Sequence, residues 1–437
     1  MREKSDVVII GAGIGGLCAA ARLTCSGYKT VLLGKSTILG GRYTCVDYKG
    51  YKVPTGAWMT FFGTNDPVWR TLQDVEAPGV ALAEPRPLTN RYKLSGKEFF
   101  LPEKGKLQAL ISVASKDKGE AEKVLTVVKR ALRWQEPSDT VSLRDWLLQY
   151  TENKEIEKVF QGMTQGYFGM EIEDTPAGEF FRVLRNMASS GAELFYKNGL
   201  KDVIDAFESA IRNRGGKLYT RAAVKQIIVK DGVVQGVVAQ GVKEKLEIEA
   251  RAVVSDAGPE KTIELAGEKN FDRGYLKEVK ELIRPAVGMG FIVKSDRPLF
   301  DVDIITDLDT PKFKWWIDFG KIFPGCASEG KHLIASFANT PSTTEHDPKE
   351  IYEAFLEDAR QRFPDFEDHG EVLLAQNFCG AWPVTRSWQG YMVSQKTPIE
   401  NLYNVGDAVN PSGWIVGAGV AENARIVAED IMVRIKL

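Results

Sequence analysis

The residues with the clearest chemistry form a glycine-rich stretch near the start of the chain, Gly11-Ala12-Gly13-Ile14-Gly15-Gly16. An apolar run at residues 7–10 precedes it, and a small, alanine-rich stretch follows it. We therefore expect a buried strand, a tight turn and a helix whose first N–H groups face an anion. Gly11 would allow the turn, Gly13 would let a pyrophosphate approach the backbone, and Gly16 would let the helix pack closely on the sheet. The stretch predicts a dinucleotide site.

One element of such a site is missing. The second expected strand, residues 30–33, is followed by Gly34, where an acidic residue usually holds the ribose 2′-OH about 20 positions after the glycines. Losing a charged acceptor costs about 1.5–3 kcal/mol of binding. We expect Ser36 or backbone groups to compensate in part. The positive charge of Lys35 would also suit a 2′-phosphate, so a ligand that carries this group remains an alternative at this point.

Three further stretches combine glycine with polar residues. Residues 39–42 read Leu-Gly-Gly-Arg, which suits a loop close to a diphosphate with Arg42 supplying charge. Residues 50–57 read as a short hairpin strand that enters a tight turn. Residues 401–407 read as a strand ending in Gly406-Asp407, followed by a second glycine-rich turn at 411–419 and a helix from about 420 to 435. The start of that helix is suited to meet a buried anion.

Composition excludes several classes of protein. The 437 residues correspond to about three domains. The content of 43% hydrophobic and 27% charged residues is that of a globular protein. A net charge of −2 offers no global case for nucleic acid. The five cysteines, without a CxxC pair, favour reduced thiols in a cytoplasmic protein, and the three histidines lack metal-ligand spacing, so we expect no metal site. No apolar run is long enough to cross a membrane.

Two long stretches separate the glycine motifs. Apolar positions at three- and four-residue steps predict helices at 125–134, 143–150, 155–167 and 177–187. Alternating patterns predict strands at 287–293, 313–317 and 332–337. These stretches predict a mixed sheet with a helical cap, threaded between parts of the nucleotide domain.

The glycine motifs in this order resemble a known family. VVIIGAGIGGL, LGGR, the turn at 50–57 and NLYNVGDA followed by GAGVAENARIVAEDI resemble the phytoene desaturase-like branch of the FAD-dependent amine oxidase superfamily. Residues 200–257 are similar too, with a helix, an Asp-Gly hairpin and a buried strand. The resemblance implies an α/β fold: a Rossmann-like FAD-binding domain made of residues 1–75, 190–270 and 380–437. That domain is interleaved with a mixed-sheet substrate domain and helical cap at 76–189 and 271–379.

The resemblance also implies FAD as the cofactor, rather than NADP. It implies that the diphosphate lies at the first glycine loop and Arg42, the adenine near the main chain of Val224, and the ribityl or phosphate groups near Asp407. The isoalloxazine would lie near the backbone at 414–416. The expected cofactor residues are Gly11, Gly13, Gly15, Gly16, Ser36, Gly41, Arg42, Gly56, Ala57, Trp58, Val224, Gly406, Asp407, Trp414, Ile415 and Val416. The sequence departs from the family at Gly34 and at Pro54, where an Asp is common.

The expected substrate pocket is aromatic. Several of the nine tryptophans lie in segments expected beside the flavin, and they either line the pocket or pack in the core. Arg386 either binds an anionic substrate group or forms a surface ion pair. The expected pocket residues are Tyr167, Trp382, Arg386 and Trp388. No catalytic acid or base is assigned, because hydride transfer to flavin N5 needs orientation and desolvation more than a dedicated nucleophile.

Three functions are consistent with these residues. The leading hypothesis is an FAD-dependent oxidoreductase that desaturates, saturates or isomerises C–C bonds of an apolar, isoprenoid-like substrate. The alternative is C–N oxidation of an amine or amino acid, and a third is a non-catalytic binding relative that has lost the flavin, prompted by Gly34. An apolar substrate fits peripheral contact with a membrane through the basic amphipathic stretch that contains Lys123, Lys129, Arg130 and Arg133, although a solvated face has the same pattern.

Overall fold

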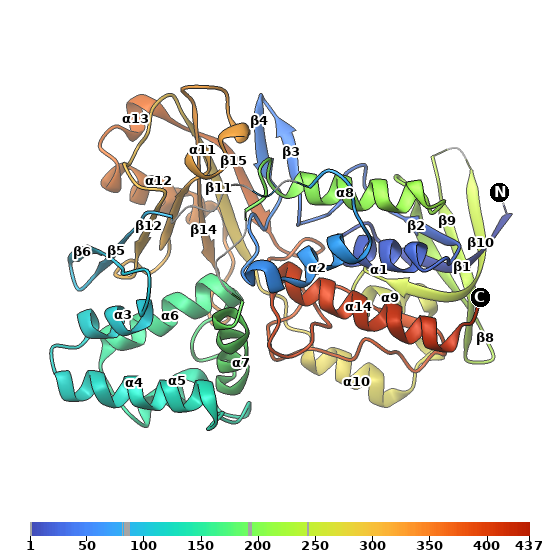
Figure 1. The fold of residues 1–437 in the computed structure, drawn as a ribbon, viewed down its shortest axis with the longest axis horizontal. Helices are drawn as coiled ribbons and strands as arrows, with labels where there is room; N and C mark the ends of the chain where they lie inside the picture. Colours follow the sequence, from blue (N-terminus) through green and yellow to red (C-terminus); the bar gives the residue numbers. More distant parts are fainter. Residues whose placement is uncertain (1, 81, 83–87, 191–194, 243) are drawn as a thin grey trace.

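The computed structural model describes residues 2–80, 82, 88–190, 195–242 and 244–437, which fold around two large sheets in opposite halves of the molecule (Figure 1). The first sheet has the strand order β7-β2-β1-β10-β9-β8, with β16 paired to β10. Strands β7, β2, β1, β10 and β16 are parallel, and β9 and β8 continue antiparallel. The strands are β1 (Arg2–Ile10), β2 (Thr30–Leu33), β7 (Lys217–Tyr219), β8 (Ala223–Lys230), β9 (Val233–Gln240), β10 (Lys245–Ser255) and β16 (Leu402–Asn404).

The first sheet is covered on both faces, which explains the unbroken apolar run at its centre. Val7 and Ile9 belong to the same buried cluster as residues of α1, α8 and α14. Val8 and Ile10 point the other way and share a cluster with residues of α9 and α10. The helices on the two faces, with α2 on the same side as α1, are α1 (Ile14–Cys25), α2 (Pro67–Asp74), α8 (Leu200–Asn213), α9 (Pro259–Ala266), α10 (Arg273–Leu282) and α14 (Val416–Arg434).

Three separated segments build the first sheet. β1 and β2 come from the start of the chain, β7 to β10 from the middle and β16 from the end. The boundary near residue 270 differs, however. Tyr275 and Val279 of α10 are buried in the cluster around Val8, so this helix packs with the first sheet rather than with the substrate side.

The second sheet has the order β15-β11-β14-β13-β12-β5-β6. One of its faces packs on α12 (Pro348–Arg362), where the rings of Phe291 and Phe355 stack at 4.0 Å. Its strands are β5 (Asn90–Leu94), β6 (Lys97–Phe100), β11 (Gly288–Ser295), β12 (Ile304–Asp307), β13 (Trp315–Asp318), β14 (His332–Asn339) and β15 (Gly370–Phe378). The small hairpin of β3 (Cys45–Tyr48) and β4 (Tyr51–Pro54) and the short helices α11 (Phe319–Ile322) and α13 (Phe366–His369) complete this half.

A helical lobe lies beside the second sheet, at the lower left of Figure 1. Its helices share one buried cluster, which is the cap that the periodicity predicted. They are α3 (Lys106–Ala114), α4 (Lys118–Arg133), α5 (Leu143–Leu148), α6 (Lys154–Phe168) and α7 (Ala177–Ala188). Within the described part of the chain, no helix has the length and apolar character needed to span a bilayer.

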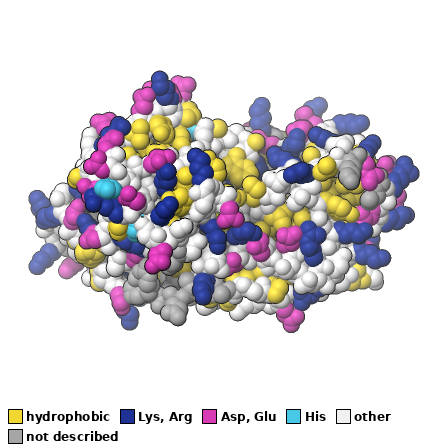
Figure 2. Space-filling view, turned by 90° about the horizontal axis from the view of Figure 1, so that it is seen from above, with side chains coloured by type: hydrophobic (Ala, Val, Ile, Leu, Met, Phe, Trp, Pro, Cys, Tyr) yellow, Lys and Arg dark blue, Asp and Glu magenta, His cyan; other side chains and the backbone are white. Residues whose placement is uncertain are grey.

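The surface is mixed in charge. On the face shown in Figure 2, Lys and Arg side chains are interspersed with Asp and Glu. That distribution agrees with the near-zero net charge.

Candidate active site

A cavity of about 810 Å³ lies where the two sheets and α6 meet. Its walls come from the loops after β1, β2 and β16, from the end of the β3–β4 hairpin, from α6, from β11, β14 and β15, and from residues 380–387. The carboxyl ends of the parallel strands β2, β1, β10 and β16 face this cavity, which is where open α/β sheets bind ligands.

Most of the expected cofactor residues line the cavity: Gly11, Gly13, Ser36, Gly41, Arg42, Gly56, Ala57, Trp58, Val224, Gly406, Asp407, Ile415 and Val416. Gly15 and Gly16 are buried in the first turn of α1, directly behind the lining residues Gly13 and Ile14. Trp414, whose backbone was expected near the isoalloxazine, is not among the lining residues. Its ring packs on Phe62 at 4.9 Å between centroids, and Arg70 lies over it at 5.8 Å.

The first glycine loop has a backbone conformation and a close approach to the strand that residues with side chains could not adopt. Gly11 has φ 100°, a conformation that favours glycine. A Cβ on Gly16 would lie 2.1 Å from the carbonyl oxygen of Gly11, so helix and strand approach as closely as expected. The N–H of Gly40 donates to the carbonyl of Ala12 at 2.7 Å, which joins the second glycine motif to the first.

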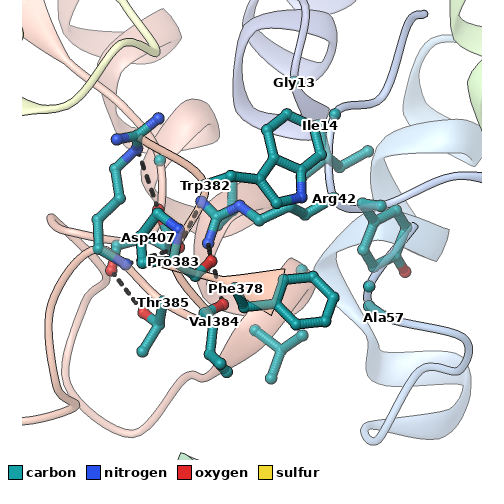
Figure 3. A pocket seen from close by; sticks show the side chains of 18 of the residues that line it. Gly13, Ile14, Arg42, Ala57, Phe378, Trp382, Pro383, Val384, Thr385 and Asp407 are labelled. Atoms are coloured by element: carbon teal, nitrogen blue, oxygen red, sulfur yellow. Dashed lines mark hydrogen bonds and ion pairs between the residues drawn. The ribbon is translucent and has the colours of Figure 1, made fainter. Parts of the chain in front are cut away.

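Arg42 links the loop after β2 to two other segments. Its Nη1 donates to the carbonyls of Pro383 at 2.8 Å and Val384 at 2.9 Å, and its Nη2 lies 2.7 Å from Oδ2 of Asp407 (Figure 3). The Arg386 N–H also donates to that oxygen at 3.0 Å. The Asp407 carboxylate therefore already has a cation and a backbone donor before any ligand is considered.

Asp256, which the sequence interpretation did not single out, lies at the centre of the glycine motifs. It follows β10 directly, and its Oδ2 accepts a hydrogen bond from the Gly16 N–H at 3.1 Å. Burial raises the pKa of this carboxyl to about 7, although the Gly16 bond and the nearby Arg386 act in the opposite direction. A polar residue at the carboxyl end of a buried strand was the available signal for it.

The position after β2, where a ribose-binding acid is usual, holds Gly34 for a packing reason. A Cβ on Gly34 would lie 2.9 Å from the Cβ of Ala12, so a longer side chain there would displace the glycine loop. Ser36 lines the cavity and is exposed, and its Oγ accepts from the Ile38 N–H at 3.0 Å. Besides Ser36 and the main chain near Val224, the lining of the cavity includes the charged residues Lys35, Glu260, Lys261 and Glu264.

The last helix begins at the cavity. α14 starts at Val416, four residues before the position that the sequence suggested. Val416 has φ 50°, which is rare for a β-branched residue and signals local strain. Ile415, Val416 and Gly417 all line the cavity, so the amino end of the longest described helix faces it.

The expected substrate residues are divided. Tyr167 on α6, Trp382 and Arg386 line the cavity. Trp388 is not among its lining residues, so the prediction that it lines the pocket is corrected: its ring packs against Tyr391 at 5.9 Å, and Arg284 lies over both rings. Arg386 lies on the nucleotide side, with its Nε 3.8 Å from Oδ1 of Asp407.

The substrate-side wall is apolar. α6, β11, β13, β14 and β15 contribute no charged side chain to the described lining of the cavity. Their polar members are amides and hydroxyls, and Gln376 and Asn339 each donate to a backbone carbonyl, of Pro54 and Gln165 respectively. The aromatic members of this side of the cavity, including the 58–61 loop and α11, are Trp58, Phe61, Tyr167, Phe168, Phe291, Phe319, Phe337 and Phe378.

A strand–glycine loop–helix unit facing a cavity, with a second sheet closing its far side, defines a dinucleotide-dependent oxidoreductase fold. The residues present fit FAD: a glycine cradle that side chains would fill, an arginine beside it, and an apolar wall opposite. The family model of flavin containing amine oxidoreductases matches residues 14–432, and the chain belongs to that family. It is an FAD-dependent oxidoreductase.

Individual relatives are distant. An uncharacterized protein of Methanocaldococcus jannaschii is 23% identical over 94% of this chain and 96% of its own length. A 4,4′-diapophytoene desaturase of Methylomonas is 23% identical, over 55% of this chain and 52% of its own length. The crystal structure of an oxidoreductase from Methanosarcina mazei superimposes with a TM-score of 0.87, at 26% identity, covering 98% of this chain and 100% of that one.

Proposed function

We propose that this FAD-dependent oxidoreductase acts on C–C bonds of an apolar, isoprenoid-like substrate by desaturation, saturation or isomerisation. The observation that carries the proposal is the uncharged, aromatic wall formed by α6 and the second sheet. An ammonium or carboxylate substrate would have to lose its hydration there without a charged partner, whereas a hydrocarbon loses nothing. The likeness to a diapophytoene desaturase supports the same substrate class.

The chain's own residues bind, orient and desolvate the substrate. FAD, when bound, accepts or donates the hydride. Phe337, whose ring stacks on Trp315 at 4.9 Å between centroids, and Phe378 supply flat, rigid surfaces against which a polyene aligns. Tyr167 adds one hydroxyl to this wall, and Arg42 and Asp407 stay on the opposite, nucleotide side.

The test uses FAD-reconstituted protein without oxygen. A long-chain polyene such as 4,4′-diapophytoene should bleach the flavin band near 450 nm (roughly, as flavins absorb), or a more unsaturated polyene should reoxidise the photoreduced flavin. Putrescine and hexylamine should do neither. Bleaching of the flavin by these amines under the same oxygen-free conditions, with peroxide release once air is admitted, together with no response to either polyene, would overturn the proposal in favour of C–N oxidation.

Variants of the wall sharpen the test. Phe337→Asp introduces a charge into the apolar wall, and we expect it to raise KM for the polyene about tenfold or more, from the cost of pairing a hydrocarbon with a carboxylate. Phe337→Leu keeps the wall apolar and should change KM by less than about threefold. Phe100→Asp, on the exposed outer strand β6, is the matched control and should leave KM unchanged. Equal effects of F337D and F100D would place the substrate elsewhere.

A further inference from the structure

The Asp256 side chain fills the space behind the glycine loop. A Cβ on Gly13 would lie 2.4 Å from its Oδ2, one on Gly15 would lie 3.0 Å from its Oδ1, and one on Gly406 would lie 2.8 Å from Oδ1. The carboxyl is therefore enclosed by the turn after β1 and by the turn after β16, at the wall of the cavity. Its Oδ2 accepts a hydrogen bond from the N–H of Gly16, on the first turn of α1 that would face a bound diphosphate.

The two arginines near Asp256 already pair with another carboxylate, that of Asp407, before FAD binds. From the segments packed against it, the titratable and charged groups are Cys18 on α1, Arg42 after β2, Arg386, and Asp407 after β16. Both arginines already lie at the Asp407 carboxylate, at 2.7 Å and 3.8 Å. With a doubly charged diphosphate present, a neutral Asp256 leaves one negative charge uncompensated, and an ionised Asp256 leaves two in a buried setting.

We propose that Asp256 links FAD binding to the uptake of one proton: its carboxyl is neutral when the diphosphate lies on the glycine loop, and FAD binds more weakly once that carboxyl ionises. In its neutral form the side chain still accepts from the Gly16 N–H, and its O–H becomes a donor beside the diphosphate. Burial already holds the pKa of Asp256 at about 7 in the protein alone, so the link operates near neutral pH. FAD occupancy would then respond to pH without any change in fold.

The direct test measures FAD affinity against pH. FAD fluorescence quenching gives the Kd between about pH 6 and pH 8. The wild-type Kd should rise about tenfold over that range, because FAD would bind the form in which the Asp256 carboxyl is protonated, and that form becomes scarce above about pH 7. Asp256→Asn keeps the acceptor for Gly16 but cannot ionise, and its Kd should change by less than about twofold. A flat wild-type profile, or an equal slope in D256N, would overturn the proposal.

A matched control is available in Asp66, a second fully buried carboxyl whose pKa burial also raises to about 7, and which is not among the cavity-lining residues. Asp66→Asn should keep the wild-type tenfold rise, and loss of the rise in D66N would show that general stability, not Asp256, sets it. Calorimetry on the wild type in two buffers of different ionisation enthalpy covers the case in which D256N does not fold. At pH 8 it should report close to one proton taken up per FAD, and a value near zero would refute the link.

Discussion

Arg42 is the side chain that ties the glycine motifs to the C-terminal half of the site, so its loss should be costly. Arg42→Ala removes two charged hydrogen bonds, to the carbonyls of Pro383 and Val384, and the 2.7 Å ion pair with Asp407. Hydrogen bonds to charged groups are worth about 1.5–3 kcal/mol each when buried. Water from the cavity can replace part of these contacts, so we expect a loss of about 2–4 kcal/mol in the free energy of unfolding.

Urea unfolding of the FAD-free protein measures this loss. Arg212→Ala is the control, because the ion pair of Arg212 with Glu208, at 2.8 Å, lies within one helix and the Arg212 side chain is 49% exposed. That variant should lose no more than about 0.5 kcal/mol. Arg42→Lys keeps the charge but not the forked geometry, and should fall between the two. If R42A and R212A were equally stable, the idea that Arg42 joins these segments would be wrong.

Other expectations concern strain, pH and the surface. In V416G, relief of the left-handed backbone should offset the loss of the side chain, so the free energy of unfolding should fall by less than about 1 kcal/mol. V420G, at a buried position on the same helix, should lose about 3 kcal/mol or more. Thermal unfolding measures both, and equal losses would show that Val416 is not strained. Burial raises the pKa of Asp66 to about 7, so the folded protein keeps a proton which the unfolded chain releases at about pH 4, and stability should fall as pH rises from about 5 towards 7. Asp66 and Asp256 each contribute up to about 1.4 kcal/mol per pH unit to this fall, so D66N should remove the share of Asp66 and leave that of Asp256. The expected membrane contact is the basic face of α4 with the adjacent Trp134, which is 72% exposed. If this surface binds a membrane, the protein should float with anionic vesicles at about 50 mM salt, where the Debye length is about 14 Å, but not at about 500 mM. R130E should abolish this flotation, and flotation unaffected by salt would argue against the contact.

The parts of the site that are local in sequence could be predicted. The β1–turn–α1 unit and strand β2 follow from the apolar run and the glycines, because a few neighbouring residues determine them. The cap helices were found for the same reason, through their periodicity. Strand β15 and helix α12 were not anticipated, and β15 completes the second sheet only by pairing with β11, far away in the chain.

Side-chain environments were harder to predict. Trp388 was expected to line the substrate pocket, and the tryptophans beside the flavin segments were left open between pocket and core. The rings of Trp388 and Trp414 both pack against other aromatic rings outside the cavity lining. Asp256 was not anticipated because its meaning depends on Gly13, Gly15 and Gly406, which only the folded chain brings around it. The missing acid at Gly34 gained an explanation in the same way, from its distance to Ala12.

The position of β16 and α14 has a consequence for synthesis. β16 pairs with β10, Asp407 follows β16, and α14 packs along α1, so later segments of the sequence sit against much earlier ones. The Tyr28 hydroxyl even donates to the carbonyl of Ile435. A nascent chain on the ribosome can thus form the glycine loop early, yet it lacks one wall of the cavity until β16 and the start of α14 have been made. We therefore expect tight binding of FAD to await the synthesis of β16 and α14.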